Sequence, residues 1–337
     1  MKETDLARYL TQFLAVYLPG QRGMKRNSQI SYRDAFSLVL EYSRDYEKIS
    51  PDKLSISQID RGFVLRFLAW LEESRHCKAA TRNQRLAAIH SFFSFLIVEA
   101  PQYIEQAQKV LAIPMKKTER PPLMYLPLDA VKGLLDQPDR KTVRGRRDAV
   151  LLSLLYDTGA RVQELIDLKI GDISLNEAVT VRLTGKGGKS RIVPVMKPTG
   201  ELLKQYIENA GLNAPVYHAN YLFTNRSNKP LTRAGVTDIL KKHARSAQLN
   251  GVADISDEIT PHWLRHSKAM HLLQAGVNLV YIRDLLGHAD ISTTEIYARA
   301  DERMKRKALM EAYNSPTNEE LPSWKKDKDL LDWLKSL

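Results

Sequence analysis

The sequence has few of the features that mark exported, disulfide-bonded or membrane-spanning proteins. It holds one cysteine, Cys77, in 337 residues, which excludes an internal disulfide framework and any cysteine-based zinc cluster. The N-terminal stretch MKETDLARYL lacks the apolar core of a signal peptide, and no uninterrupted apolar run approaches about 18 residues. We therefore expect a soluble, unexported protein of the reducing cytoplasm that has no membrane partner.

Acidic residues are too few to balance the basic ones. Lys and Arg total 51 against 39 Asp and Glu, which gives a formal charge of +12 and a pI near 9.5. Such an excess points to a polyanionic partner, nucleic acid above all, although a merely basic soluble protein has the same composition. The hydrophobic content of 43% is enough for two domains that each have a core.

The order of apolar residues predicts two domains joined by a linker. Residues 1–112 place apolar side chains at spacings of three and four almost throughout, as in FVLRFLAWLEE, which predicts an all-helical domain. Residues 113–122, IPMKKTERPP, contain three prolines and little to bury, so we expect an extended linker there. Residues 123–313 are expected to form the second domain, and residues 314–337 a tail with a short amphipathic helix.

The second domain has a mixed pattern. The segments LDAVKGLLDQ and RRDAVLLSLLYDTG predict helices, whereas AVTVRL and RIVPV predict two strands joined by the turn TGKGGKS. The sequence thus predicts a mainly α protein whose second domain is mixed α/β with a small antiparallel sheet. Further helices are expected at about 200–209, 232–247, 261–275, 279–286 and 301–313.

The stretch TPHWLRHSKAMHLL places positive side chains where a helix end is already positive. Thr260 is a good N-cap and Pro261 a good first residue of a helix. The first turns then carry His262, Arg265, His266 and Lys268. These groups repel one another unless an anion binds at the helix end. The alternative is a metal site, because His262 and His266 have the spacing of zinc-binding helices, but the arginine between them and the lack of a nearby acidic cluster disfavour a bound cation.

Two upstream segments carry further basic groups. In DTGARVQELIDL, Glu164 lies one helical turn beyond Arg161 and is placed to hold its guanidinium, although an ordinary surface ion pair has the same pattern. The turn LTGKGGKSR is no phosphate loop, because Leu183 stands where that motif needs glycine and a strand follows. The segment instead predicts the tip of a β-hairpin that carries Lys186 and Lys189. These lysines either reach the backbone of a bound nucleic acid or remain solvated.

The segment YIRDLLGHADISTTEIYARA contains the remaining candidates. His288 follows a helix-ending Leu-Gly, and Tyr297 lies nine residues further on. The three hydroxyl residues 292–294 disfavour a helix before Tyr297. We therefore expect Tyr297 on a short segment that presents its hydroxyl to a site, with a packing tyrosine as the alternative.

Together and in this order, TGARVQEL, GKGGKSR, HWLRHS, LGH and a tyrosine nine residues later resemble the motifs of the tyrosine recombinase family, the phage integrase and Xer-like proteins. The resemblance implies that Tyr297 is a nucleophile that attacks DNA and forms a 3'-phosphotyrosyl bond. It implies that Arg161 and Arg265 clamp the scissile phosphate, that His262 and His288 complete the pocket, and that Glu164 supports it. Lys186 is then the general acid, with Lys189 the weaker claimant.

The resemblance also implies partners. The helical region 1–112 is similar to the family's core-binding domain, and the substrate is a double-stranded recombination site that a tetramer holds as two duplexes, without cofactor or metal. The tail is then expected to pack on a neighbouring protomer, or else to fold back on its own domain. Candidate DNA-contacting residues are Lys78, Arg82, Arg85, Lys189 and Arg191.

Two rival functions stay open at this point. One is a DNA-binding protein that has the fold without the chemistry. The other is a metal-dependent hydrolase that uses His262, His266 and His288. If the chain is a recombinase, it would act in the cytoplasm at the nucleoid, on a mobile element or in resolving DNA.

Overall fold

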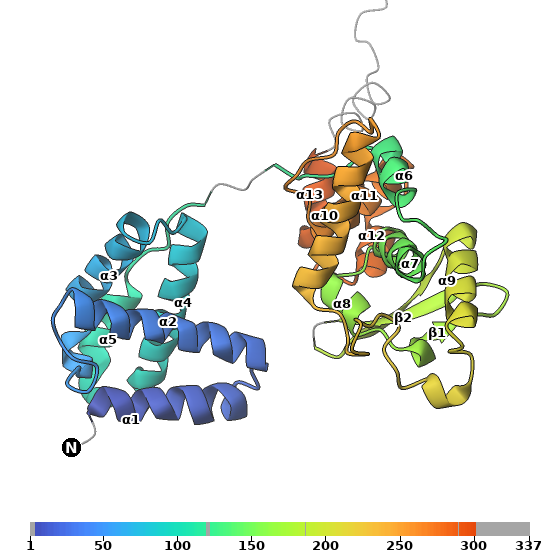
Figure 1. The fold of residues 1–337 in the computed structure, drawn as a ribbon. Helices are drawn as coiled ribbons and strands as arrows, with labels where there is room; N and C mark the ends of the chain where they lie inside the picture. The colour runs from blue at the N-terminus through green and yellow to red at the C-terminus, as the bar shows by residue number, and fades with distance from the viewer. Residues whose placement is uncertain (1–3, 119–121, 186, 289, 301–337) are drawn as a thin grey trace, which may run out of the picture. The chain divides into compact units, whose positions relative to one another are not determined.

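The computed structural model describes residues 4–118, 122–185, 187–288 and 290–300. The chain separates into two compact units, Met1–Pro121 and Pro122–Leu337, which we call the N-terminal and C-terminal units (Figure 1). The fold is mainly helical with one small antiparallel sheet, which confirms the predicted fold class. Among the described helices, none is both long enough and apolar enough to cross a membrane. The predicted helix at 301–313 and the tail lie outside the described residues, as does Lys186.

The N-terminal unit consists of helices around an aromatic core. Its helices are α1 (Asp5–Gln12), the π-helical Phe13–Gln21, α2 (Arg26–Asp45), the short 3-10 turn Ile56–Gln58, α3 (Arg61–Glu73), α4 (Ala79–Glu99), the 3-10 turn Pro101–Tyr103 and α5 (Ile104–Leu111). Rings of Phe13, Phe36 and Phe92, from three of these elements, meet edge to face with centroids 5.1 to 6.2 Å apart. Such contacts tie helices distant in sequence into one bundle.

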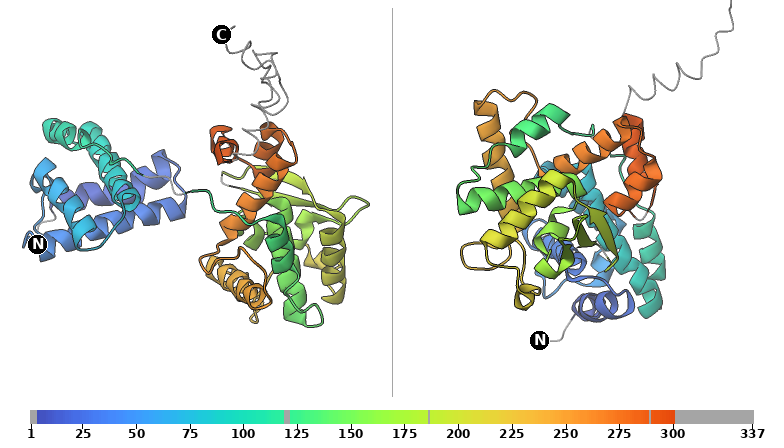
Figure 2. Two further views of the ribbon diagram at one scale, coloured as in Figure 1. Left: turned by 90° about the horizontal axis from the view of Figure 1, so that it is seen from above. Right: turned by 90° about the vertical axis from the view of Figure 1, so that its right-hand side faces the viewer.

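The C-terminal unit combines the remaining helices with the sheet, which lies at the periphery of the unit (Figure 2). Its elements are α6 (Leu128–Leu135), α7 (Val143–Thr158), α8 (Val162–Ile166), the 3-10 turn Ile170–Asp172, β1 (Ile173–Ser174), β2 (Thr180–Thr184), β3 (Ser190–Pro194), α9 (Lys197–Asn209), the 3-10 turn Pro215–Tyr217, α10 (Arg233–Leu249), α11 (Pro261–Gln274), α12 (Leu279–Leu286) and α13 (Ser292–Ala300). The sheet order is β1-β2-β3, with Val181 opposite Val193 and Thr184 opposite Ser190. The two predicted strands are therefore confirmed.

Helix α7 is the central support of the C-terminal unit and packs against both α9 and α11 (Figure 1). The hydroxyl of Thr142 accepts a hydrogen bond from the backbone N–H of Gly145 and caps its first turn. Its last turn ends at Gly159, whose φ of 56° is left-handed. A Cβ at Gly159 would lie 2.7 Å from the side chain of Leu286, so only glycine allows α12 to pack this closely. This contact brings the end of α7 to the segment after α12.

Candidate active site

Arg265 lies in the second turn of α11 and is buried, with 3% of the residue exposed. Its guanidinium donates to the backbone carbonyls of Gly159, at 2.5 Å, and Leu286, at 2.8 Å. Burial, followed by the positive charge of Arg161, lowers the pKa of Arg265 to about 10. The group is therefore still charged at neutral pH, and a bound anion would relieve its electrostatic cost.

Arg161 forms the N-cap of α8, directly beyond the end of α7. Its Nη1 donates to Glu164 at 2.8 Å, and its Nη2 donates to the carbonyl of Gly287 at 3.2 Å. About a third of its side chain, 35%, is exposed. Both arginines are thus fixed by the carbonyls of Leu286 and Gly287, the two residues just before His288.

Glu164 is shared by two arginines. Its carboxylate, 4% exposed, accepts from the backbone N–H and Nη1 of Arg161 and from Nη1 and Nη2 of Arg191. Burial opposes its ionisation, but the hydrogen bonds from Arg191 and Arg161 outweigh burial and lower the pKa of Glu164 to about 2. The predicted supporting contact between Glu164 and Arg161 is present in the structure, and the second arginine was missed.

The side chain of Arg191 lies mostly inside the protein. It projects from β3 with 13% of its side chain exposed, and its Nε donates to the carbonyl of Leu285 at 2.7 Å while both Nη atoms bind Glu164. A Cβ at Gly287 would lie 2.7 Å from Nη1 of Arg191, so this glycine leaves the path of the guanidinium open. Its Nε and both Nη atoms are thus bound within the protein, and its contact with DNA stays a prediction.

Two of the predicted histidines have depressed pKa values. Desolvation of its ring, followed by the positive charge of Arg265, lowers the pKa of His262. Burial, followed by Arg265 and Arg161, lowers the pKa of His288 to about 4. Nδ1 of His288 also lies 2.9 Å from the hydroxyl of Thr294. Both imidazoles are therefore neutral at pH 7 and available to accept or relay a proton.

Tyr297 lies on α13, and its ring is buried with 1% of the residue exposed. Its apolar neighbours include Met270, Ile282 and Leu286. Burial raises its pKa, and Arg265 partly offsets this effect. The prediction that Tyr297 lies on a non-helical segment is wrong, since Ser292–Ala300 is helical: the Asp290 carboxylate accepts from the Ser292 N–H and supports the first turn, and buried side chains outweigh the weak propensities of the hydroxyl residues.

His266 contacts the tyrosine hydroxyl. Its Nδ1 lies 3.0 Å from the Tyr297 oxygen, and its ring stacks on that of His262 with centroids 6.1 Å apart. Burial, followed by His262 and Arg265, lowers the pKa of His266 to about 4. The resemblance assigned His262 and His288 to the pocket and gave His266 no role there. The spacing of four residues was the available signal, since it puts both rings on one face of α11.

Comparisons with known proteins assign the chain to a family. Residues 125–304 match the phage integrase family, and residues 10–100 match the phage integrase N-terminal SAM-like domain. The chain is 35% identical over 336 residues to a putative integrase/recombinase, y4rC, of Sinorhizobium fredii, which covers 100% of this chain and 99% of that protein. The chain belongs to the phage integrase family of tyrosine recombinases.

Further relatives of this recombinase include tyrosine recombinase XerD of Listeria monocytogenes, 34% identical over 302 residues that cover 87% of this chain and 93% of that protein. A similar solved structure is XerH site-specific recombinase bound to difH substrate in a pre-cleavage complex. It has a TM-score of 0.64 and 25% identity, and the match covers 87% of this chain and 82% of that one.

Three of the predicted DNA-contacting residues lie in the N-terminal unit of the recombinase, and they differ in exposure. Lys78 is exposed at the N-cap of α4, as a DNA contact requires. Arg82 is instead buried, at 5% exposed, and donates to Asn83 and to the carbonyl of Pro114. Arg85 is partly buried and donates to the carbonyl of Ser31. Arg82 is thus held within the N-terminal unit, and its contact with DNA stays a prediction.

The first part of the predicted linker is bound to the N-terminal unit. The side-chain amide of Asn83 donates to the carbonyl of Lys116 at 2.8 Å and accepts from its N–H at 3.0 Å. Nζ of Lys116 also forms an ion pair with Glu72 at 2.8 Å. These contacts hold Pro114 and Lys116, which lie in neither a helix nor a strand, against α3 and α4.

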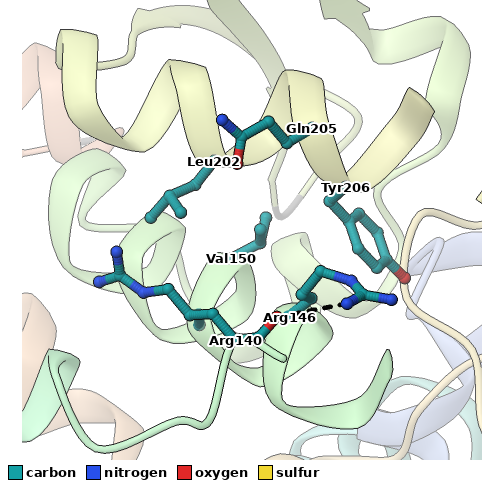
Figure 3. Close-up of a pocket in the computed structure, with 7 residues that line it drawn as sticks. Arg140, Arg146, Val150, Leu202, Gln205 and Tyr206 are labelled. Carbon is teal, nitrogen blue, oxygen red and sulfur yellow. Dashed lines mark hydrogen bonds between the residues drawn. The ribbon is translucent and has the colours of Figure 1, made fainter. Parts of the chain in front are cut away.

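Two other features of the described chain lie outside this site. A small cavity of about 60 Å³ opens between the first half of α7 and α9 and is lined by Arg140, Arg146, Val150, Leu202 and Tyr206 among others (Figure 3). Nη1 of Arg146 is used there to donate to the carbonyls of Arg140 and Lys141.

Within the described ranges, no three His, Cys, Asp or Glu side chains lie close enough to hold a metal ion. Lys189 is exposed in the β2–β3 turn.

Proposed function

We propose that this recombinase cleaves and rejoins DNA at a specific double-stranded site, with Tyr297 as the nucleophile. The observation that carries the proposal is the convergence of three candidate groups at the C-terminal end of α12. Arg265 donates to Leu286, Arg161 donates to Gly287, and His288 follows directly. Two guanidinium groups held side by side, beside a tyrosine, are suited to a phosphodiester and to few other substrates.

The arginines supply the charge that the transition state needs. Attack of a phenol oxygen on the scissile phosphate concentrates negative charge on the non-bridging oxygens. Arg161 and Arg265 are fixed before the reaction by carbonyls and by Glu164, so they need little reorganisation to meet that charge. The bond between the phosphorus and the 5' oxygen breaks as the bond to Tyr297 forms. The resulting 3'-phosphotyrosyl ester is then open to attack by the 5'-hydroxyl of another strand, which rejoins the DNA.

Proton transfers accompany both bonds. Burial raises the pKa of Tyr297, so its hydroxyl is protonated at neutral pH and must lose its proton to attack. A neutral histidine accepts it: His266 holds the hydroxyl before attack, and His262 is next to it on α11. We propose that Lys186, in the glycine-rich turn between β2 and β3, gives the proton to the departing 5' oxygen.

The nucleophile has to become accessible first. Tyr297 is 1% exposed and its hydroxyl contacts His266, so no phosphate reaches it in this arrangement. Attack therefore requires α13 to move relative to α11. We propose that DNA binding drives this movement, since a bound phosphate between the arginines offers the tyrosine a new partner.

A nicked suicide substrate tests the proposed chemistry. The chain is expected to form a covalent adduct with such DNA in the presence of EDTA, and Tyr297→Phe is expected to form none while still binding DNA. The matched control is Tyr281→Phe on α12, whose side chain is 71% exposed and should not matter. An adduct in Tyr297→Phe, or none in the natural chain, would contradict the proposal. Loss of DNA cleavage in EDTA would favour a metal-dependent hydrolase instead.

We propose that the remaining partners follow the same function. Strand exchange between two duplexes needs four tyrosines, so a tetramer is expected on two recombination sites, in the cytoplasm at the nucleoid. Residues 1–112, with Lys78 among them, would bind the DNA together with the catalytic domain at 123–313 and Lys189. Integration, excision and resolution are all compatible with this chemistry.

The tail at 314–337 is proposed to pack on a neighbouring protomer. In its sequence LPSWKKDKDLLDWLKSL, the spacing of Leu330, Trp333 and Leu334 would place all three on one side of a helix, which is more apolar surface than a solvated helix keeps. Truncation after residue 316 is expected to leave binding of a single protomer unchanged and to remove cooperative binding in a gel-shift titration. A truncated chain that binds and exchanges DNA cooperatively would show that the tail serves its own protomer.

A further inference from the structure

A ladder of three polar contacts joins the last turn of α7 to one face of α11. At its first rung Arg265 donates to the carbonyl of Gly159 at 2.5 Å. At the second, Nζ of Lys268 lies 3.7 Å from Oδ1 of Asp157. The residues on α11 are three apart, so each rung lies about one turn beyond the last. The third rung, between Tyr156 and His271, continues the same spacing.

The third rung is a hydroxyl–imidazole contact. The Tyr156 oxygen lies 2.9 Å from Nδ1 of His271. Burial, followed by the charge of Asp157, raises the pKa of Tyr156 to about 12, and burial lowers the pKa of His271. Tyr156 is therefore a protonated phenol and His271 a neutral ring at pH 7. The only full charges on the second and third rungs are those of Asp157 and Lys268.

This ion pair is buried, unlike most of the others in the described residues. The side chains of Lys268 and Asp157 are 11% and 8% exposed, and the ammonium also lies over the ring of Tyr156, 5.1 Å from its centroid. Oδ2 of Asp157 is enclosed without a hydrogen-bond partner in the described structure. A buried pair of this kind is costly to form and stays in place only if its surroundings hold both charges together. Lys268 is thus anchored inside the protein and is not free to reach DNA.

The Asp157–Lys268 pair lies between the two helical segments that carry Arg161 and Arg265. Asp157 lies on the last turn of α7, four residues before Arg161, and Lys268 lies one turn after Arg265. A charge attraction between these two turns acts directly on the distance between the elements that carry the two arginines. A well-packed apolar pair would hold the helices together equally well, but it would tolerate sliding of one past the other, whereas a charge pair favours one register.

We propose that Asp157 and Lys268 are positioning residues, which set the register of α7 against α11 and so the spacing of the Arg161 and Arg265 guanidinium groups. The inference rests on the proposed function of these arginines and deepens it. Neither residue touches the DNA phosphate. Their effect on cleavage passes through the two arginines, whose productive geometry tolerates little displacement.

The test separates binding from cleavage in four variants: Asp157→Asn, Lys268→Met, the double variant and Lys268→Arg. Single neutralisation leaves the other charge buried and unpaired, so each is expected to slow formation of the covalent adduct on a suicide substrate on the order of 100-fold. The dissociation constant for DNA is expected to stay within about three-fold, since the phosphate contacts of the whole interface remain. Lys268→Arg restores the charge pair and should recover most of the rate.

The double variant tests whether the two residues act as one unit. Removing both charges avoids an unpaired buried charge, so its loss should be far smaller than the product of the two single losses. Independent residues would instead give losses that multiply.

The control is a buried carboxylate elsewhere on α7. Asp148 is 2% exposed, accepts from Nε and Nη2 of Arg147 and lies 3.1 Å from Nε2 of His243. It is nine residues before Asp157, about 13 Å along the helix. Asp148→Asn should lower the melting temperature as the test variants do, but leave the cleavage rate of the folded protein unchanged.

Each outcome decides the inference. Slow cleavage with intact binding, rescue by arginine and non-multiplying losses support it. It is overturned if the single variants cleave at the natural rate, or if Asp148→Asn slows cleavage equally at an equal loss of melting temperature. In both of those cases the natural chain still forms the adduct, so the proposed function stands. If the natural chain forms no adduct, the proposed function and this inference fail together.

Discussion

Arg265→Lys is expected to reduce the rate of covalent cleavage of a suicide substrate by about 100- to 1,000-fold, the cost of losing one fixed donor to the developing charge. Lysine keeps the positive charge, but it lacks the planar fork that binds the carbonyls of Gly159 and Leu286 at once and still faces a phosphate. Single-turnover rates of adduct formation measure the effect. DNA affinity should change little, because one phosphate contact is a small part of the interface.

The control for Arg265 is Arg283→Lys on α12. Arg283 is partly exposed and pairs with its neighbour Asp284, so the same change of chemistry there should leave cleavage unaffected. A rate for Arg265→Lys within about five-fold of the natural chain would show that a positive charge alone is sufficient at this position. The planar guanidinium group would then not be required to bind the phosphate.

Glu164→Gln is expected to destabilise the C-terminal unit by about 3–5 kcal/mol, the usual effect of removing one partner from a buried ion pair. Two guanidinium groups share this carboxylate, so Arg161 and Arg191 both lose their charged partner. Cleavage should fall as well, because Arg161 is then held only by the carbonyl of Gly287. Urea unfolding at pH 7, followed by circular dichroism, measures the stability change. Glu201→Gln on α9 is the control, since that side chain is exposed.

The same variant carries a pH dependence. The folded pKa of Glu164 is about 2, below the unfolded value of about 4.3, so the carboxylate stabilises the fold above roughly pH 4.3 and loses that contribution as the pH falls toward 2. The natural chain should therefore lose stability between pH 5 and pH 2 more steeply than Glu164→Gln does. Equal slopes for the two proteins would mean that Glu164 is not the carboxylate responsible.

The sequence predicted those parts of the site that depend on residues close together in the chain. The helix starts at Thr260 and at Arg161, the Glu164 contact and the two strands all depend on residues within a few positions of each other, where capping, helical spacing and alternation decide the structure. The order of the motifs then supplied the family. Periodicity also predicted that the N-terminal unit is helical, because its amphipathic faces can be read directly from the residues.

Contacts between segments that are distant in the sequence could not be predicted. Arg191 is an exposed strand residue by pattern, and only the packing of β3 near α8 and α12 brings Glu164 and Leu285 to it. Arg82 is buried because residues beyond α5 return to α4 and present the carbonyl of Pro114. Helix α13 forms against local propensity because Thr294 and Tyr297 are fully enclosed. The placements of Arg191 and Arg82 have no signal in neighbouring residues, and for α13 the only local signal is Asp290, whose carboxylate accepts from the Ser292 N–H.

The enclosure of Tyr297 has a consequence for the host genome. A protein with an accessible activated phenol beside two arginines would nick any duplex that it met by chance, and most encounters of a basic protein with DNA are non-specific. Its hydroxyl contacts His266 and its ring lies among Met270, Ile282 and Leu286, so under the proposed mechanism the unbound chain would offer no nucleophile. Strand breakage would then be restricted to complexes that have displaced α13, and random collisions along the chromosome would leave it intact.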